Sequence, residues 1–432
     1  MIRKEEGAIF ATIMIILALT LSMRVNAQEE LKVNWVVENN PSFSYDIPFS
    51  ICEKDTYIYV AGFYYSIDTG IFQPRVEKRF KNDGSLIKNW TCKPSDYGGL
   101  LYDCLIAGEK LYAVGMSYSL TDSNWILLVL DLDLNLLNYF NFTETSGAAT
   151  SIISDQDFLY VAGLTTNETG QGICVEKIRI ADLSIVKKYV SNISEFQEAY
   201  NIEINPVSNQ IWIVGTTNSE RWSIEIFDKE LNHIKTIEKE IGASAISVSF
   251  DDEGSSYVVG EGGIIKLDKG GEEIKKYEQE GFFTKTLFSS NRLYVASMES
   301  VENYIRQTLY VFDKELNLLN KTVVSRGIDA DAVFLMGRMV SDKENLYISG
   351  LAYIGYNDYE WVICSIKIGG TPWYLKNPYL IATPVIVILI VLAIFFIFKI
   401  KKAKPQPTIA TPQHSNSGGE QQSSETDKHA EN

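Results

Sequence analysis

A short, strand-like run recurs seven times along this chain, and the repetition constrains the fold more than any other feature. Each copy is aromatic and aliphatic and ends in Gly or Ser, as in YIYVAG, LYAVG and IWIVG. The last residues of successive copies are 53, 48, 52, 45, 37 and 53 positions apart. Such a period is typical of architectures in which each repeat is one supersecondary unit. The copies lie at residues 57–62, 111–115, 159–163, 211–215, 256–260, 293–297 and 346–350.

Each copy is the second of four predicted strands in a unit. In the stretch 292–322, the copy is followed by a run at 308–312, a turn at 313–315 and another run at 316–319. Runs rich in Val, Ile, Tyr and Phe between Asp, Asn and Gly are typical of strands and hairpin turns, where these turn residues supply positive φ. One more run precedes each copy, at residues 46–52, 101–107, 149–153, 201–204, 245–250, 284–288 and 332–338.

Four antiparallel strands repeated seven times predict an all-β fold, a seven-bladed β-propeller with four-stranded blades. Each blade is buried on both faces, which agrees with the nearly continuous apolar runs. An array of β-sandwiches is the alternative, but it needs longer, alternating strands and linkers that the sequence lacks. The last unit has only three predicted strands, whereas an extra one at 31–38 precedes the first unit. We expect this N-terminal strand to close the last blade and remove the open edges.

Two stretches of the repeat, YIYVAGF…VEKRFKNDGSLIKNW and IWIVGTTNSERWSIEIFDKELN, resemble the YVAG-type β-propeller repeats of exported prokaryotic proteins, a class that includes the delta-60 and SBBP repeats. The resemblance covers residues 31–368. It implies the propeller fold and a surface location, and it brings no common catalytic residues. The chain departs from the pattern in its shortened fifth unit and in Ser297, which replaces the terminal Gly of the sixth copy.

The first residues, 1–27, have the pattern of a secretory signal peptide. Arg3 and Lys4 precede an apolar run at 8–21, and the small residues that end at Ala27 offer a cleavage site. An uncleaved signal anchor is the alternative. In both cases the body of the chain is exported.

An uncharged apolar stretch at 379–398 predicts one transmembrane helix, because about 20 such residues span a bilayer. Four lysines follow it within six residues, and the positive-inside bias assigns them to the cytoplasm. We therefore expect a single-pass plasma-membrane protein with its propeller, 28–368, outside the cell on a short stalk, 369–378. The cytoplasmic segment 399–432 is a basic stop and a tail too poor in large apolar residues to fold.

The formal net charge is −16, and residues 28–398 hold −18 because the two flanking segments each carry +1. Nucleic-acid binding needs clustered Lys and Arg against phosphates, so we expect no nucleic-acid partner. Anionic lipid headgroups would also repel so acidic a body, which leaves the predicted helix as its contact with the membrane.

Five cysteines offer one disulfide in an exported domain. Its sequence-near candidates are Cys92 with Cys104 or Cys52 with Cys104, and the spacing leaves both open. We expect most of the cysteines, which include Cys174 and Cys364, to be buried free thiols that act as small hydrophobes.

Histidine is scarce, and this limits the chemistry. Of the three histidines, His414 and His429 lie in the tail, which leaves only His233 in the body. No Ser-His-Asp triad and no multi-His metal site can form there, and no metal-ligand spacing such as CxxC occurs. We therefore predict no catalytic residue, no metal and no cofactor.

Polar residues at the starts of the innermost strands are the candidate ligand-binding residues. In a propeller these strands converge on a channel whose mouth is the usual ligand site. A ring of acids there can bind a cation or a polyol, and a pair of carboxylates can hydrolyse a glycosidic bond. The alternative is that these groups solvate a water-filled channel and cap strand ends. The residues are Asp46, Asp103, Tyr200, Asn201, Lys285, Asp329 and Asp331.

Five Asn-x-Ser/Thr sequons predict N-glycosylation. All except Asn167 fall at or just beyond the predicted outermost strands, where a glycan does not disturb the core. The sequons begin at Asn89, Asn141, Asn167, Asn192 and Asn320.

These observations predict a membrane-anchored surface propeller that binds a protein, a glycan or an envelope component. The alternative is an extracytoplasmic carbohydrate-active hydrolase or lyase that uses carboxylates at the channel mouth.

Overall fold

The structure is a computed structural model, and it describes residues 31–368 apart from 43, 93–97, 119–121, 168–169, 192–196, 218–220, 302–303, 325–332, 335–336, 343 and 356–357. The chain divides into two compact units, Ala27–Gly370 and a second unit of Met1–Asn26 with Thr371–Asn432. The predicted signal peptide, transmembrane helix and tail lie outside the described residues. Within the described ranges, no helix is both long and apolar enough to cross a bilayer.

The described residues form five antiparallel sheets. The first contains β2 (Asp46–Lys54), β3 (Tyr57–Ser66), β4 (Ile71–Phe80) and β5 (Leu86–Thr91). The second contains β6 (Gly98–Ala107), β7 (Lys110–Tyr118), β8 (Ser123–Asp131), β9 (Leu136–Ser154), β10 (Phe158–Asn167), β11 (Gly170–Arg179) and β12 (Ile185–Val190). The third contains β13 (Gln197–Ile204), β14 (Ile211–Thr217), β15 (Arg221–Phe227) and β16 (His233–Lys239).

The fourth sheet contains β17 (Ala245–Phe250), β18 (Ser256–Leu267), β19 (Glu273–Ser289), β20 (Arg292–Val301), β21 (Tyr304–Phe312) and β22 (Leu318–Val323). The fifth contains β1 (Lys32–Asn39), β26 (Asp358–Lys367), β25 (Asn345–Gly355), β23 (Val333–Phe334) and β24 (Met339–Ser341). Strands within each sheet follow sequence order, except that β1 joins the last sheet.

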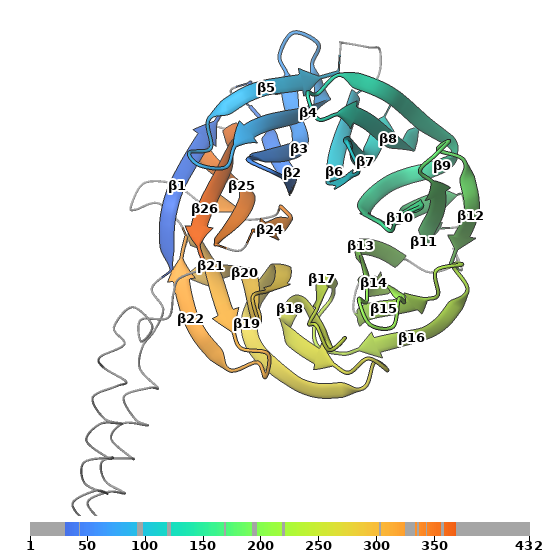
Figure 1. Ribbon diagram of the computed structural model, residues 1–432, viewed down its shortest axis with the longest axis vertical. Helices are drawn as coiled ribbons and strands as arrows, with labels where there is room; N and C mark the ends of the chain where they lie inside the picture. Colours follow the sequence, from blue (N-terminus) through green and yellow to red (C-terminus); the bar gives the residue numbers. More distant parts are fainter. Residues whose placement is uncertain are drawn as a thin grey trace, which may run out of the picture. The chain divides into compact units, whose positions relative to one another are not determined.

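The sheets of the unit Ala27–Gly370 are arranged in a ring around a common centre, as in a β-propeller (Figure 1). Two long strands explain why some sheets have more than four strands. The first half of β9 pairs with β8 and its second half with β10, and β19 pairs in the same way with β18 and then with β20. Each of these strands therefore serves as the outer strand of one unit and the inner strand of the next. The predicted all-β fold is confirmed.

The N-terminal strand closes the ring. β1 pairs antiparallel with β26 from Lys32 opposite Lys367 to Asn39 opposite Trp361, and Figure 1 shows the two strands side by side. Side chains from the last sheet, such as Trp361 and Ile363, pack against Ile51 and Val60 of the first sheet. The predicted pairing of the N-terminal strand with the last unit is confirmed, and it covers an edge that would otherwise be open.

The glycine that ends the repeat faces a β-bulge in the innermost strand. In β6 the bulge leaves Tyr102 outside the register between Leu101 and Asp103, opposite the end of the repeat in β7. A Cβ atom on Gly115 would lie 1.8 Å from the carbonyl oxygen of Leu100. Only glycine permits so close a backbone approach. The corresponding Cβ-to-oxygen distances at Gly62, Gly163, Gly215 and Gly260 are 2.0, 2.1, 1.8 and 2.0 Å.

Four turns between third and fourth strands depart from the expectation that Asp, Asn or Gly takes the positive φ. Leucine takes it instead, with φ of 58° at Leu134, 59° at Leu183, 53° at Leu231 and 56° at Leu316. Leu183 is half-buried, and the other three leucines are only 2% exposed. Burial of about one leucine side chain, about 2 kcal/mol, offsets the cost of a left-handed residue. The expectation is wrong at these turns, and Gly84, with φ of 71°, fits it.

Three of the sequons lie on perimeter strands. Asn89 is on β5, Asn141 on the first half of β9 and Asn320 on β22 (Figure 1). The side chains of Asn89 and Asn141 are exposed, and that of Asn320 is half-buried. Asn192 lies outside the described residues. Asn167 ends β10. Glycosylation itself stays a prediction.

Candidate ligand-binding cavity

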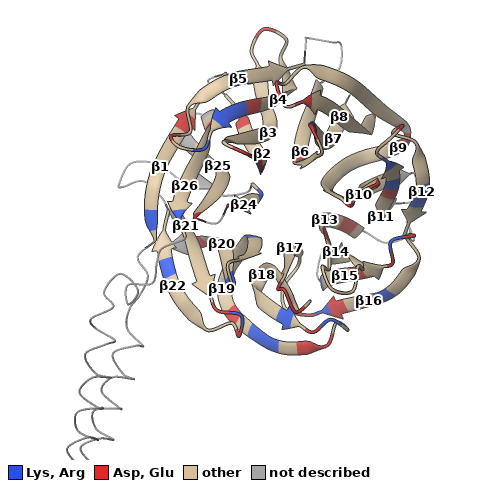
Figure 2. Cartoon of the chain, in the orientation of Figure 1, with Lys and Arg blue, Asp and Glu red and all other residues tan. Residues whose placement is uncertain are grey.

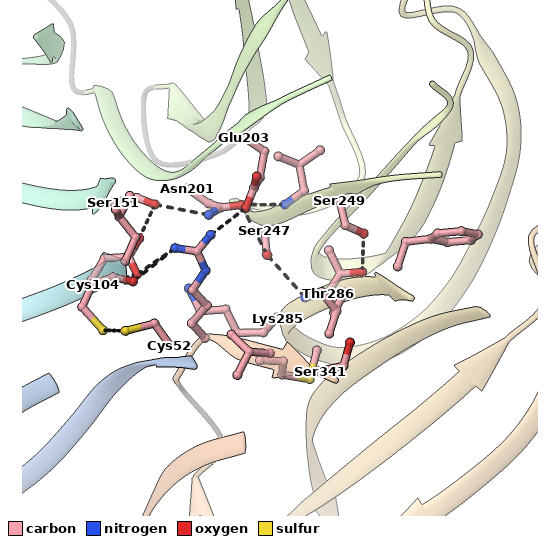
Figure 3. A pocket seen from close by; sticks show the side chains of 18 of the residues that line it. Cys52, Cys104, Ser151, Asn201, Glu203, Ser247, Ser249, Lys285, Thr286 and Ser341 are labelled. Atoms are coloured by element: carbon pink, nitrogen blue, oxygen red, sulfur yellow. Dashed lines mark hydrogen bonds and ion pairs between the residues drawn. The ribbon is translucent and has the colours of Figure 1, made fainter. Parts of the chain in front are cut away.

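A cavity of about 470 Å³ opens where the innermost strands converge. Its lining comes from β2, β6, the second halves of β9 and β19, β13, β17, and β24 with the preceding Arg338 (Figure 3). The volume suits one small ligand rather than a polymer chain. Five charged side chains line it: Glu53, Asp103, Glu203, Lys285 and Arg338.

Five polar side chains join neighbouring inner strands around the channel, and we call them the inner polar ring. Each stands directly after a bulge and accepts a hydrogen bond from a backbone N–H of the next inner strand. The donor-to-acceptor distances range from 2.9 to 3.4 Å. The pairs are Ser50 with the N–H of Cys104, Asp103 with Ile152, Ser151 with Ile202, Asn201 with Val248, and Ser247 with Thr286.

Asp103 is the most fully bonded member of the ring. Its Oδ1 accepts hydrogen bonds from the Ser50 hydroxyl at 2.7 Å and from the N–H of Cys104 at 2.9 Å. Its Oδ2 accepts from the Ser151 hydroxyl at 2.9 Å and from the N–H of Ile152 at 3.0 Å. The residue is only 5% exposed. This carboxylate therefore joins three inner strands and has little capacity left for a ligand.

Arg338 reaches across the channel from the last unit. Its Nη1 lies 3.5 Å from Oδ1 of Asp103, and its Nη2 lies 3.2 Å from Oε1 of Glu203. Nη1 is also 3.4 Å from the carbonyl oxygens of Cys104 and Ile152. One guanidinium therefore contacts three consecutive units of the ring, which suits the fixed fork of donors in arginine.

The charges in the cavity perturb one another. Burial by itself lowers the pKa of Arg338, but the carboxylates of Asp103 and Glu203 outweigh it, and the net shift is upward. Burial raises the pKa of Glu203, and Arg338 opposes the shift only in part. The guanidinium is therefore permanently charged, whereas the carboxyl of Glu203, with its raised pKa, takes up a proton more readily than an ordinary glutamate as pH falls.

Lys285 differs from the other charged groups in the cavity. Glu53 forms an ion pair with Lys81, and Asp103 and Glu203 pair with Arg338. No hydrogen bond or ion pair joins the amine of Lys285 to any other described residue. Burial lowers its pKa, and the attraction of the two carboxylates does not restore it.

Hydroxyl groups and aromatic rings complete the lining of the cavity. The hydroxyls of Ser249 and Thr286 are 3.1 Å apart, and Ser341 donates to Ser289 at 2.8 Å. The aromatic members are Phe49, Tyr102, Phe250 and Phe288. Such a lining offers both donors and acceptors beside flat apolar faces, as polyhydroxylated ligands require.

The candidate residues from the sequence divide into three groups. Asp103, Asn201 and Lys285 line the cavity. Asp46 does not, and its buried carboxylate accepts from the N–H of Ser42 at 2.8 Å. Tyr200 is the bulge residue of β13 and donates its hydroxyl to Glu198. Asp329 and Asp331 lie outside the described residues.

Sequence reasoning missed two residues at the centre of the cavity, Arg338 and Glu203. Both stand near the end of a predicted inner strand, 332–338 or 201–204, whereas the candidates from the sequence stand at the starts of these strands. A search for charged residues at both ends of each inner strand would have found them.

No group of three or more His, Cys, Asp or Glu side chains in the described part of the chain has the geometry to hold a metal ion. Figure 2 shows acidic and basic residues mixed around the whole ring, on perimeter strands and turns. The described charges are therefore not sorted by sign into separate sectors around the ring.

Comparisons with known proteins support the fold. No protein-family model matches the chain, and no curated protein matches it. The chain is similar to a catalytically inactive virginiamycin B lyase from Staphylococcus aureus, solved with quinupristin, at 11% identity and TM-score 0.54, over 79% of this chain and 100% of that one. It is also similar to the WD40 domain of Neurospora crassa Pan2, at 10% identity and TM-score 0.53, over 78% and 96%. A streptogramin B lyase gives 11% identity and TM-score 0.52, over 78% and 99%.

These likenesses show the β-propeller fold alone, because the same scaffold supports unrelated functions. The resemblance to YVAG-type repeats stays a prediction.

Proposed function

We propose that this chain is a membrane-anchored, seven-bladed surface propeller that binds a protein, a glycan or an envelope component. The observation that supports binding rather than catalysis is the state of the cavity carboxylates. Asp103 already accepts four hydrogen bonds, and Glu203 is paired with Arg338. Hydrolysis of a glycosidic bond needs one carboxyl as proton donor and a second as base or nucleophile, both facing the substrate.

The seven repeats and the division of β9 and β19 between neighbouring units support a count of seven blades. The apolar segment 379–398 and the signal-like start support the anchor and the orientation. Two of the similar structures are lyases and a third is a WD40 domain, so the scaffold is compatible with an enzyme and with an interaction module. The engaged carboxylates favour the interaction module.

The test uses full-length protein in detergent, incubated with a panel of envelope glycans. Retention on the panel measures binding, and mass spectrometry of the same glycans measures turnover. We expect at least one component to be retained with its mass unchanged. Product formation that is lost in Glu203→Gln and kept in Asp133→Asn would overturn the proposal in favour of the enzyme. Asp133 is a suitable control because it is an exposed carboxylate at a perimeter turn.

Orientation is tested on intact cells. We expect a membrane-impermeant amine reagent to label propeller lysines such as Lys88 and to leave a C-terminal tag inaccessible to protease. Labelling of the propeller only after lysis would refute the surface location.

A further inference from the structure

The amine of Lys285 is the one charged group of the cavity that has no partner among the described residues. Lys285 is partly buried, and a partly desolvated ammonium without a partner costs free energy, so burial lowers the pKa of this amine. The neighbouring charges do not offer it a partner, because Arg338 already engages Asp103 and Glu203. The cavity thus contains one unused cationic donor.

The surroundings of Lys285 indicate what that donor can receive. Figure 3 shows Lys285 beside Thr286 and below Ser247, with Ser249 and Ser341 nearby. Their hydroxyls can both donate and accept, which matches hydroxyl groups of a ligand. The aromatic side chains of Phe250 and Phe288 line the same cavity and supply apolar faces for ring C–H groups.

We propose that the cavity binds a small, polyhydroxylated carboxylate, such as a sugar acid, with the ligand carboxylate on Lys285. The proposal rests on the binding function above and specifies its ligand. A ligand carboxylate would supply the charge-assisted hydrogen bond that Lys285 lacks. Arg338 then acts as a positioning residue, since its donors hold Asp103 and Glu203 away from the amine.

Isothermal titration of the full-length protein with galacturonate, galactose and galactosamine tests the charge preference without any variant. We expect galacturonate to bind about tenfold or more tightly than galactose, as one charge-assisted hydrogen bond implies, and galactosamine to bind least. Lys285→Met should abolish the difference between galacturonate and galactose, and Lys88→Met on the perimeter should leave it unchanged.

Three results would each overturn the proposal. They are equal binding of galacturonate and galactose, a preference for galacturonate that survives in Lys285→Met, and no binding of any of the three sugars. Binding of the sugars without a charge preference would contradict the ligand proposed here but not the proposed binding function. The panel of envelope glycans tests that binding function separately.

A second observation, independent of the first, concerns two thiols. Sγ of Cys52 in β2 lies 3.4 Å from Sγ of Cys104 in β6, and both are free thiols in the structure. The two residues are 6% and 0% exposed. Ser50 fixes the relative position of the two strands, because its hydroxyl donates to Asp103 and accepts from the N–H of Cys104.

We infer that Cys52 and Cys104 form a disulfide that joins the first two units of the ring. An S–S bond of about 2.05 Å needs the two sulfurs to approach by little more than a rotation of the side chains. The two thiols lose their protons and two electrons, and a disulfide-bearing oxidant such as glutathione disulfide is reduced to two thiols. The geometry thereby decides between the pairings that the spacing leaves open.

Full-length protein refolded in a glutathione redox buffer and digested without reduction tests the pairing. We expect a peptide that links Cys52 to Cys104, with Cys174 and Cys364 alkylated only after denaturation. Cys52→Ser should remove the link and free one thiol, whereas Cys174→Ser should leave it. Alkylation of both Cys52 and Cys104 in the unreduced, denatured protein, or a link from Cys92 to Cys104, would refute the inference. This test does not depend on export.

Discussion

Replacement of Gly115 by alanine tests why the repeat ends in glycine. The new Cβ would lie 1.8 Å from the carbonyl oxygen of Leu100, 2.8 Å from its carbonyl carbon and 2.9 Å from Cα of Leu101. All three atoms belong to the backbone of the bulged strand β6. No side chain can rotate away to relieve the contact, so the two strands must separate.

The size of the effect follows from that separation. Carbon and oxygen ordinarily approach to about 3.3 Å, so β6 and β7 must move apart by about 1.5 Å at this point. Overpacking costs about 1–3 kcal/mol where side chains can adjust, and weakening of two flanking ladder hydrogen bonds adds about 1 kcal/mol each. We expect Gly115→Ala to lower the free energy of unfolding by about 4 kcal/mol, near the upper end for one substitution.

Urea denaturation of the full-length protein, followed by fluorescence of the buried tryptophans, measures this loss. Gly108→Asn is the matched control, because Gly108 has φ of 62° with no atom within 4 Å of its added Cβ, and asparagine tolerates that conformation. We expect the control to cost about 1 kcal/mol or less. In the sixth unit Ser297 stands at the same position, opposite the bulge between Phe283 and Lys285, so the expected cost is specific to the second unit.

A loss below about 1 kcal/mol in Gly115→Ala would refute the argument, since the two strands would then separate without resistance.

Three further predictions concern the cavity and the perimeter. Asp103→Asn should lower the free energy of unfolding by about 3–5 kcal/mol, because an amide cannot accept all four hydrogen bonds or balance the charge of Arg338. The control Asp133→Asn changes a carboxylate that is 79% exposed and should cost under about 0.5 kcal/mol. Equal losses in the two variants would refute the role of Asp103. Burial lowers the pKa of Lys285 below its ordinary 10.5, so the unfolded state binds more protons between the two values, and stability should rise with pH across that window. Denaturation of Lys285→Met at several alkaline pH values should lack this rise, and parallel curves for both proteins would contradict it. Asn89→Gln and Asn320→Gln should each remove one glycan from the intact mass of protein isolated from its native cells, and an unchanged mass would refute glycosylation at that position.

The repeat predicted the fold because its signals are local. Each strand is a run of residues with high β propensity, and each glycine or aspartate of a turn acts within a few positions, so one sequence suffices to locate them. The pairing of the strand at 31–38 was also predictable, because the repeat leaves the last unit with only three strands and leaves this strand outside any unit. Its partner β26 lies more than 300 residues away in the sequence, but the number of strands in each unit was enough to predict that the two strands pair.

The cavity was less predictable because its contacts are not local. Arg338 and Glu203 are separated by 135 residues, and nothing near either residue indicates the other. The bulges were also invisible, because a bulge depends on the register between two strands and not on the composition of either. Asp46 and Asp103 occupy similar places in the sequence, at the inner strands of the first and second units. Asp46 caps a loop through Ser42, whereas Asp103 follows a bulge and faces the channel.

The last unit is joined to the first unit or to the N-terminal strand at two places, one at the perimeter of the ring and one at the channel. The contact at the channel is part of the cavity. At the perimeter β1 completes the last sheet through its ladder with β26. At the channel the backbone N–H of Arg338 donates to the carbonyl of Phe49 at 3.1 Å, while its guanidinium contacts Asp103 and Glu203. The residue that fastens the last unit to the first therefore also fixes the charges around Lys285. Because one residue performs both tasks, a ligand that stabilises this arrangement of charges also stabilises the closed ring, and binding and unfolding are thermodynamically linked.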